Sequence, residues 1–270
     1  MTSPATATKP GRKAARAAAD AHKPPQNHEF DWNAFNPKAY HQHNYMTVRD
    51  DDRQIVEHVR DFFGRSPLPP NARGLDVGPG ANLYPTLSML PFCSALDLVE
   101  FSTANVAWLR GQQSWVRRFD RSWRSWDPFW KLYGEDRNYE HYVRSHSPFA
   151  EFRRKAVISQ GSIFDLPRRR YEIGTMFFVA CSLSADRNEF FRAVTRFLEA
   201  LKTGAPFAAA FMTGSSGYEI KDRTFPAFPV TEETVRHATR KHAPSTIVTP
   251  IASDLRPEVG MVLATGYRGR

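Results

Sequence analysis

A glycine turn that directly follows a buried-strand pattern is the feature that most limits how this chain can fold. Residues 74–84 read Gly-Leu-Asp-Val-Gly-Pro-Gly-Ala-Asn-Leu-Tyr, and a second apolar run, 95–99, ends on the carboxylate Glu100. Gly78 and Gly80 allow the backbone to approach a ligand that a Cβ atom would exclude, and a carboxylate closing the neighbouring strand can accept from both hydroxyls of a ribose. The pattern predicts a site for an adenosine-containing cofactor.

The spacing of the glycines distinguishes between classes of such cofactors. A dinucleotide site favours G-x-G-x-x-G, in which the third glycine packs the helix beneath a pyrophosphate, but Leu83 stands at that position. No phosphate-binding lysine follows the turn. S-adenosylmethionine carries no phosphate, so the shorter G-x-G fits it better. We therefore expect S-adenosylmethionine as the cofactor, and an ordinary turn is the alternative interpretation.

Beyond this unit the chain alternates between strand and helix patterns. An amphipathic segment, 189–201, precedes an apolar run, 206–212, of the kind that is buried on both faces of a parallel sheet. The other expected elements are strands at 74–77, 95–100, 156–159 and 173–180, helices at 83–90, 102–109 and 231–241, and a terminal hairpin of 246–251 with 260–267. This order predicts an α/β fold with a Rossmann-like, doubly wound sheet, and the hairpin fits the seven-stranded sheet of class I methyltransferases.

Charge and composition set the outer limits of this interpretation. The formal net charge is +9, and five basic side chains with one acidic side chain in residues 1–25 contribute +4 of it. Because this segment has almost no large apolar side chain, we expect a disordered basic tail, 1–27, with a mitochondrial-type presequence as the alternative. A single domain, 28–270, should follow, with N-terminal lid helices over 28–70. No apolar run approaches the roughly 20 residues that span a membrane, so we expect a soluble, cytoplasmic protein without a membrane partner.

The segment 111–155 is rich in both aromatic and arginine residues. Aromatic rings that stack on bases, with arginines that neutralise phosphates, would make a nucleic-acid surface. The interpretation that we favour is a helical cap whose aromatic rings pack inward while the arginines face solvent, because the aromatics are mostly Trp at helix-like intervals. Nucleic acid is therefore not an expected partner. A basic RNA- or protein-binding module on the same scaffold stays as the alternative function.

Four groups of residues, in order and spacing, resemble the small-amine methyltransferases typified by nicotinamide, phenylethanolamine and indolethylamine N-methyltransferases. They are 35–40 with Tyr45, 75–80 with Tyr84, 100–105, and 215–218 with 225–229. The resemblance runs from about residue 30 to the C-terminus. It implies transfer of a methyl group to a small, aromatic or heteroaromatic metabolite, with N-methylation favoured and C- or O-methylation as alternatives. Such an activity, with the Ala, Arg and Pro bias of the chain, is typical of bacterial secondary metabolism.

The resemblance also implies roles for individual positions. In the family, two N-terminal tyrosines fold over the methionine end of the cofactor, and these correspond to Tyr40 and Tyr45. The complete set implied for cofactor binding is Tyr40, Tyr45, Gly78, Gly80, Tyr84, Glu100, Phe101, Asn105, Ser162, Ile163, Phe178 and Val179. Ser162 departs from the family, which usually has an aspartate there to accept from the adenine amino group. A serine hydroxyl can still accept a hydrogen bond, more weakly.

The sequence differs more from the family at the positions expected to bind the methyl acceptor. The amine enzymes place an acid just after the fifth strand, where this chain has Phe211, so an apolar acceptor or one without a cationic amine becomes an expectation. The implied acceptor-site residues are Phe211, Thr213, Tyr218 and His41, and the positional candidates for catalysis are Tyr40, Tyr218 and Glu219. Because the sulfonium already activates the methyl group, positioning should do most of the catalysis, and no residue is assigned as an essential base.

Histidines near the N-terminus invite comparison with a metal site. His41 and His43 are two residues apart on a helical stretch, so their side chains point to different faces. No Cys, Asp or Glu cluster completes a coordination set, and Cys93 and Cys181 are far apart in the sequence. We expect no metal and no disulfide framework.

Overall fold

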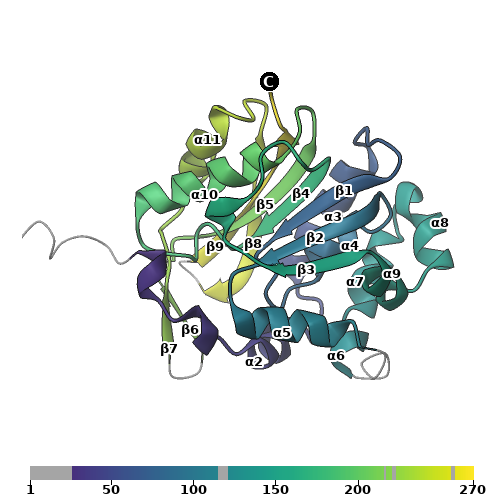
Figure 1. Cartoon of the computed structure of the whole chain (residues 1–270), viewed down its shortest axis with the longest axis horizontal. Helices are drawn as coiled ribbons and strands as arrows, with labels where there is room; N and C mark the ends of the chain where they lie inside the picture. Colours follow the sequence, from purple (N-terminus) through teal and green to yellow (C-terminus); the bar gives the residue numbers. More distant parts are fainter. Residues whose placement is uncertain (1–25, 115–120, 216, 221–222, 257–258) are drawn as a thin grey trace, which may run out of the picture.

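The computed structural model describes residues 26–114, 121–215, 217–220, 223–256 and 259–270, and at 121–122, 218–220, 253–256 and 259 it describes the backbone only. All but the last two residues of the predicted disordered tail lie outside this part of the chain. The elements of the described part form one layered α/β structure around a central sheet (Figure 1).

The central sheet has seven strands in the described residues, in the order β3-β2-β1-β4-β5-β9-β8. Their bounds are β1 Ala72–Val77, β2 Cys93–Glu100, β3 Ala156–Gln160, β4 Ile173–Phe177, β5 Pro206–Thr213, β8 Ile247–Arg256 and β9 Val259–Tyr267. The first five strands pair in parallel, whereas β9 runs antiparallel to both β5 and β8. This order confirms the predicted doubly wound sheet with a terminal hairpin at its edge.

Helices cover both faces of the sheet, because its central strands bury apolar side chains on both sides. The bounds of the main helices are α3 Asp50–Gly64, α4 Tyr84–Met89, α5 Thr103–Gln112, α10 Arg187–Ala200 and α11 Glu232–Arg240. On one face, α3 presents Ile55, Val56 and Phe63 to the core at helical spacing. On the other face, α10 buries Phe190 and Phe197. The alternating side chains of β5 enter both cores, as expected for a strand buried on two faces.

The insert between α5 and β3 forms a helical cap. Its helices are α6 Arg121–Arg124, α7 Asp127–Tyr133, α8 Arg137–Ser145 and α9 Pro148–Lys155. Buried aromatic side chains join this cap to the core: Trp123, Trp126, Phe129, Trp130, Tyr133, Tyr139, Phe149 and Phe152. Residues 115–120, including Trp115, lie outside the described part. α7 packs against α3 and α4, so the cap extends the α3 side of the molecule (Figure 1).

Smaller elements surround the carboxyl ends of the strands. They are the 3-10 turns η1 Asn27–Glu29, η2 Trp32–Ala34 and η4 Ile163–Asp165, helix α2 Pro37–Asn44, and a separate hairpin of β6 Gly217–Ile220 with β7 Arg223–Pro226. The sequence patterns did not predict this hairpin. The strand expected at 173–180 ends at Phe177, because Phe178 adopts a left-handed backbone conformation with φ of 60°. Among the described helices, none combines the length and the apolar composition that crossing a membrane requires.

Candidate functional site

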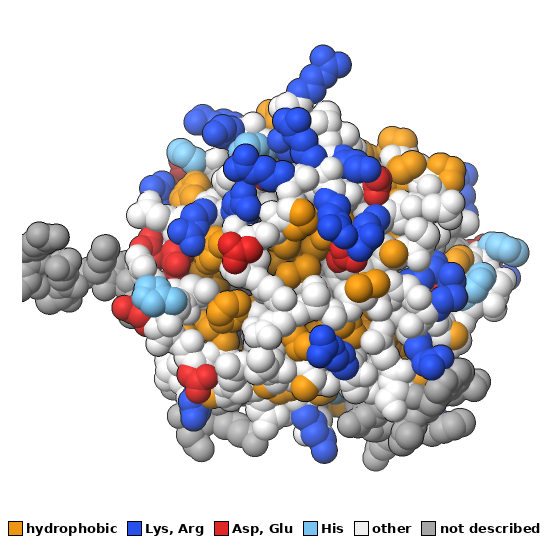
Figure 2. All heavy atoms as spheres, in the orientation of Figure 1, with side chains coloured by type: hydrophobic (Ala, Val, Ile, Leu, Met, Phe, Trp, Pro, Cys, Tyr) orange, Lys and Arg blue, Asp and Glu red, His pale blue; other side chains and the backbone are white. Residues whose placement is uncertain are grey.

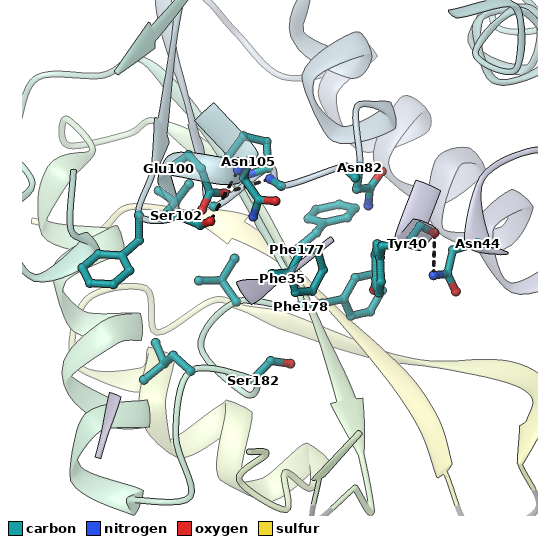
Figure 3. A pocket seen from close by; sticks show the side chains of 18 of the residues that line it. Phe35, Tyr40, Asn44, Asn82, Glu100, Ser102, Asn105, Phe177, Phe178 and Ser182 are labelled. Carbon is teal, nitrogen blue, oxygen red and sulfur yellow. Dashed lines mark hydrogen bonds between the residues drawn. The ribbon is translucent and has the colours of Figure 1, made fainter. Parts of the chain in front are cut away.

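A cavity of about 530 Å³ lies at the carboxyl ends of the central strands. Val77 of β1, Glu100 of β2, Phe177 of β4 and Met212 of β5 each line it from the end of a strand. Ligands of doubly wound sheets bind at this edge, and the volume lies in the range of about 300–1,000 Å³ typical of small-molecule sites. Figure 3 shows side chains from segments far apart in the sequence, such as Tyr40, Glu100 and Phe178, around this space.

The N-terminal segment forms the opposite wall of the cavity. Residues 26–35, which we call the N-terminal strap, contribute Asn27, Trp32 and Phe35 to the lining. The backbone N–H of Asn27 donates to Glu189 of α10 (2.7 Å), and Asn33 accepts from the backbone N–H of Thr103 in α5 (2.9 Å). The Trp32 ring also stacks on Phe225 of β7, with centroids 5.6 Å apart. The strap is therefore attached to the main domain on both sides of the cavity.

The glycine turn supplies the base of the site. Gly78 and Gly80 have φ values of 59° and 52°, which side chains rarely allow. A Cβ atom on Gly78 would lie 2.6 Å from Val179, whereas one on Gly80 would lie 3.5 Å from Asn105 Nδ2 and 4.0 Å from Glu100 Oε2. Gly78 is thus needed for packing. Gly80 leaves open the space between the Asn105 amide and the Glu100 carboxylate.

The Glu100 carboxylate is buried and fixed in this turn. It accepts from the backbone N–H of Gly80 (3.0 Å) and from that of Ser102 (2.8 Å), as Figure 3 shows in part. Burial raises the pKa of Glu100, and the hydrogen bond from Ser102 opposes that change. The Asn105 side-chain amide and the backbone N–H groups of Gly80 and Phe101 also donate to this carboxylate and oppose the change. Glu100 lines the cavity, so this fixed acceptor lies where the hydroxyls of a ribose can donate to it.

Two buried amides that line the cavity each have an atom without a hydrogen-bond partner in the described structure. These atoms are Asn82 Nδ2, a donor, and Asn105 Oδ1, an acceptor. Leaving such a group unsatisfied costs about 1–3 kcal/mol, so the arrangement favours a bound molecule with polar atoms at both places. Together with the open space above Gly80 and the fixed Glu100 carboxylate, these orphaned atoms make the residues present a good fit for an adenosyl ligand.

The structure brings together most of the positions that the family resemblance implied for the cofactor. Those that line the cavity are Tyr40, Tyr45, Gly78, Gly80, Glu100, Phe101, Asn105, Ser162, Ile163, Phe178 and Val179. Tyr84 is the exception. Its side chain is fully buried behind the turn and stacks on Phe129 with centroids 5.3 Å apart, so it supports the wall and does not line it.

The acceptor-site expectations need correction. Phe211 is buried against Phe190 of α10, with ring centroids 5.8 Å apart, and the next residue, Met212, lines the cavity instead. Successive strand residues point to opposite faces, so an alignment shifted by one position changes which of Phe211 and Met212 is expected to face the cavity. Thr213 also lies outside the lining. The backbones of Tyr218 and Glu219 belong to β6, and their side chains lie outside the described part.

His41 does not face the cavity either. It is buried, with its Nε2 atom 2.9 Å from Ser125 Oγ, and its ring packs beside Trp108 and Trp126. His41 therefore connects α2 to the cap, while His43, two residues further along the helix, lines the cavity. No group of three or more potential metal ligands occurs in the described residues.

The sequence did not indicate the acidic groups of the lining, Asp51 and Asp52. Asp51 and Asp52 lie in the first turn of α3, line the cavity and are almost fully buried. Burial, and then the neighbouring Asp51, raises the pKa of Asp52 to about 7. Acidic residues are common in the first turn of a helix because their negative charge interacts favourably with the positive end of the helix dipole. The run Asp50–Asp52 therefore did not by itself indicate a site.

Comparisons with known proteins agree with this architecture. No family model matches the chain, and no curated protein matches its sequence. The fold is similar to that of 1,6-didemethyltoxoflavin-N1-methyltransferase from Burkholderia thailandensis, solved with bound 1,6-didemethyltoxoflavin and S-adenosylhomocysteine (12% identity, 99% of this chain and 94% of that chain, TM-score 0.52). It is also similar to N-methyltransferase NodS from Bradyrhizobium japonicum WM9 (9% identity, 82% of this chain and 97% of that chain, TM-score 0.51). The chain therefore has the fold of the class I S-adenosylmethionine-dependent methyltransferases.

Proposed function

We propose that this protein is an S-adenosylmethionine-dependent methyltransferase that acts on a small aromatic or heteroaromatic acceptor. The observation that carries the proposal is the cradle between Gly80, Glu100 and Asn105, which combines an open space with unsatisfied hydrogen-bonding capacity. Glu100 would hold the ribose hydroxyls, and Ser162 with Ile163 would border the adenine. Both follow the correspondence with the small-amine methyltransferases.

The protein's part in the reaction is mainly positioning and exclusion of water. When bound, the cofactor supplies a methyl group that its sulfonium already activates. Tyr40 and Tyr45 would cover this end of the cofactor; their rings lie 5.9 Å apart, and both line the cavity. Trp32, Phe35 and Phe178 add aromatic surface to the same cavity, which suits a flat acceptor. A shared space of about 530 Å³ leaves room only for a small acceptor beside the cofactor.

N-methylation of the acceptor is the reaction that we favour. The correspondence with the nicotinamide, phenylethanolamine and indolethylamine enzymes supports it, and both similar structures described above are N-methyltransferases by name. The alternative, an RNA-binding module that uses the insert, has less support because the described aromatic side chains of the insert are mostly buried and cannot stack on bases.

Calorimetric titration with S-adenosylhomocysteine tests the proposal. We expect micromolar binding to the wild-type protein and a loss of about 10–100-fold in affinity for Glu100→Ala, because a charge-assisted hydrogen bond contributes about 1.5–3 kcal/mol. Glu135→Ala, which removes an exposed carboxylate of the cap, is the matched control and should bind normally. Absence of heat with the wild-type protein, for both S-adenosylmethionine and its demethylated product, would refute the proposal.

A further inference from the structure

The sheet order divides the cavity into two halves. Glu100 at the end of β2 and Ser162 just after β3 lie toward one side, whereas Met212 of β5 and Met261 of β9 lie toward the other. Strands β1 and β4 stand between them in the sheet. If the adenosine occupies the side of Glu100 and Ser162, as the proposed function requires, the side of β5 and β9 remains for the methyl acceptor.

The first turn of α3 forms part of the acceptor side. α3 packs on β8 and β9, and its residues Asp51 and Asp52 line the cavity with exposed fractions of 4% and 5%. Arg49 lies 3.8 Å from Asp51, and no ion pair reaches Asp52 in the described part of the chain. Asp52 is therefore a buried carboxylate that faces the cavity without a compensating cation of its own.

Two more polar groups near Asp52 lack partners. Asn82 Nδ2 lines the cavity, is almost fully buried and has no hydrogen bond in the described structure. The Tyr84 hydroxyl lies beside both Asp52 and Asn82, is fully buried, and has no hydrogen bond of normal geometry. An apolar acceptor would leave the Asp52 carboxylate, which lines the cavity, without a polar partner there. The arrangement thus indicates a ligand with a polar, hydrogen-bonding group, which differs from the apolar acceptor that the sequence at Phe211 suggested.

We infer that Asp52 holds the methyl acceptor through the N–H or O–H of its reacting atom and takes the proton that methyl transfer releases. This inference rests on the proposed function and narrows its substrate class to small molecules whose reacting nitrogen or oxygen carries a proton. In the reaction, the lone pair of that atom forms the new bond to the methyl carbon. The carbon–sulfur bond breaks with its electrons on sulfur, and the N–H or O–H proton passes to the Asp52 carboxylate.

The surroundings of Asp52 suit it to this role at neutral pH. Burial and Asp51 raise the pKa of Asp52 to about 7, against the opposing effects of Tyr84 and Arg49. The other ionisable groups that face it are Tyr40 of α2, Tyr45 at the C-terminal end of that helix, and Tyr133 of α7. A base with a pKa near the working pH combines a useful ionised fraction with adequate basicity. Transfer to a proton-bearing acceptor should therefore accelerate as the pH rises through about 7.

Steady-state kinetics on four probes tests the inference. Tryptamine, aniline and catechol present a proton on the reacting atom, whereas the ring nitrogen of nicotinamide has a lone pair and no proton. We compare the wild-type protein with Asp52→Asn, Asp52→Glu and Asp50→Asn, measuring kcat and KM from about pH 5.5 to 9. Asp50→Asn is the matched control because Asp50 is an exposed carboxylate in the same helical turn. Calorimetry with S-adenosylhomocysteine is run on every variant.

We expect the wild-type protein to methylate at least one of the three proton-bearing probes. Asp52→Asn should lower kcat for that probe by about 10²–10⁴-fold and abolish the rise with pH, and Asp52→Glu should restore part of both. Binding of S-adenosylhomocysteine should change less than about twofold, and Asp50→Asn should behave as wild type.

Several results would overturn the inference while leaving the proposed function intact. The first is an unchanged kcat in Asp52→Asn. The second is a weakened affinity of that variant for S-adenosylhomocysteine, which would assign Asp52 to the cofactor. The third is a wild-type protein that binds S-adenosylhomocysteine but methylates nicotinamide alone or no probe. Failure of the wild-type protein to bind S-adenosylhomocysteine would instead contradict the proposed function itself.

Discussion

At the scale of single residues, substitutions at Gly80 and Gly204 distinguish an effect on ligand binding from an effect on folding stability. Gly80→Ala places a methyl group between Asn105 and Glu100, and it also introduces a side chain at φ of 52°. Gly204→Ala introduces a side chain at φ of 82° with no neighbouring atom within 4 Å, far from the cavity lining. Both variants should lose about 1 kcal/mol of unfolding free energy. Only Gly80→Ala should weaken S-adenosylhomocysteine binding, by about tenfold or more, in calorimetry; equal affinities in the two variants would remove Gly80 from the site.

Local motifs explain which site residues the sequence could predict. Gly78, Gly80 and Glu100 act through backbone conformation and a strand end, and both features are visible in a few neighbouring residues. The identity of the acceptor wall depends on which of Phe211 and Met212 faces the cavity, and a shift of one residue reverses that assignment. The sequence did not indicate Asp52 for another reason. Its burial depends on the packing of α3 against strands that are distant in the sequence, and a local sequence pattern holds no information on such packing.

At the scale of elements, the cap makes a prediction about stability. Trp126 is fully buried beside Tyr45, His41 and Phe129, so it links the cap to the wall of the cavity. Trp126→Ala should lower the unfolding free energy in urea by about 3–5 kcal/mol, because a large core side chain is lost and a void remains. Arg124→Ala, an exposed neighbour in α6, should change it by about 0.5 kcal/mol or less. Comparable losses in the two variants would contradict this packing.

The regular elements were more predictable than the irregular ones. Hydrophobic periodicity located α10 and β5 to within one or two residues, since α10 has a regular apolar face and β5 is apolar over nearly its full length. The early end of β4 depends on one left-handed residue, Phe178, that carries no glycine signal. The β6–β7 hairpin is short and contains no strong turn motif, so its sequence resembled a loop.

At the scale of the whole molecule, buried acids should make stability depend on pH. Burial raises the pKa of both Asp52 and Asp76 to about 7. A folded-state pKa above the unfolded value means that the folded protein binds more protons, so stability present below about pH 4 is lost as the pH rises through about 7. Each group contributes on the order of 4 kcal/mol to this loss. Urea titrations at about pH 5 and 8 should show a smaller difference in unfolding free energy between the two pH values for Asp52→Asn than for wild type. An equal difference would contradict the burial of the Asp52 carboxylate.

The overall charge does not point to one partner. Figure 2 shows more Lys and Arg side chains on the upper half of the visible face than on the lower half, with acidic side chains among them. Arg73 with Asp97 and Arg196 with Glu199 are examples of arginines already paired within the protein. Of the net charge of +9, residues 1–25 carry +4, so the basic character belongs partly to a segment that the structure does not describe. That RNA is not a partner stays a prediction.

The attachment of the N-terminal strap on both sides of the cavity has a consequence for the timing of catalysis. The Asn27–Glu189 and Asn33–Thr103 hydrogen bonds and the stacking of Trp32 on Phe225 hold this segment along the cavity wall. If ligands of the proposed methyl transfer pass the strap, each catalytic cycle includes a step in which these contacts separate and re-form. Once chemistry is fast, release of the demethylated cofactor would then limit turnover.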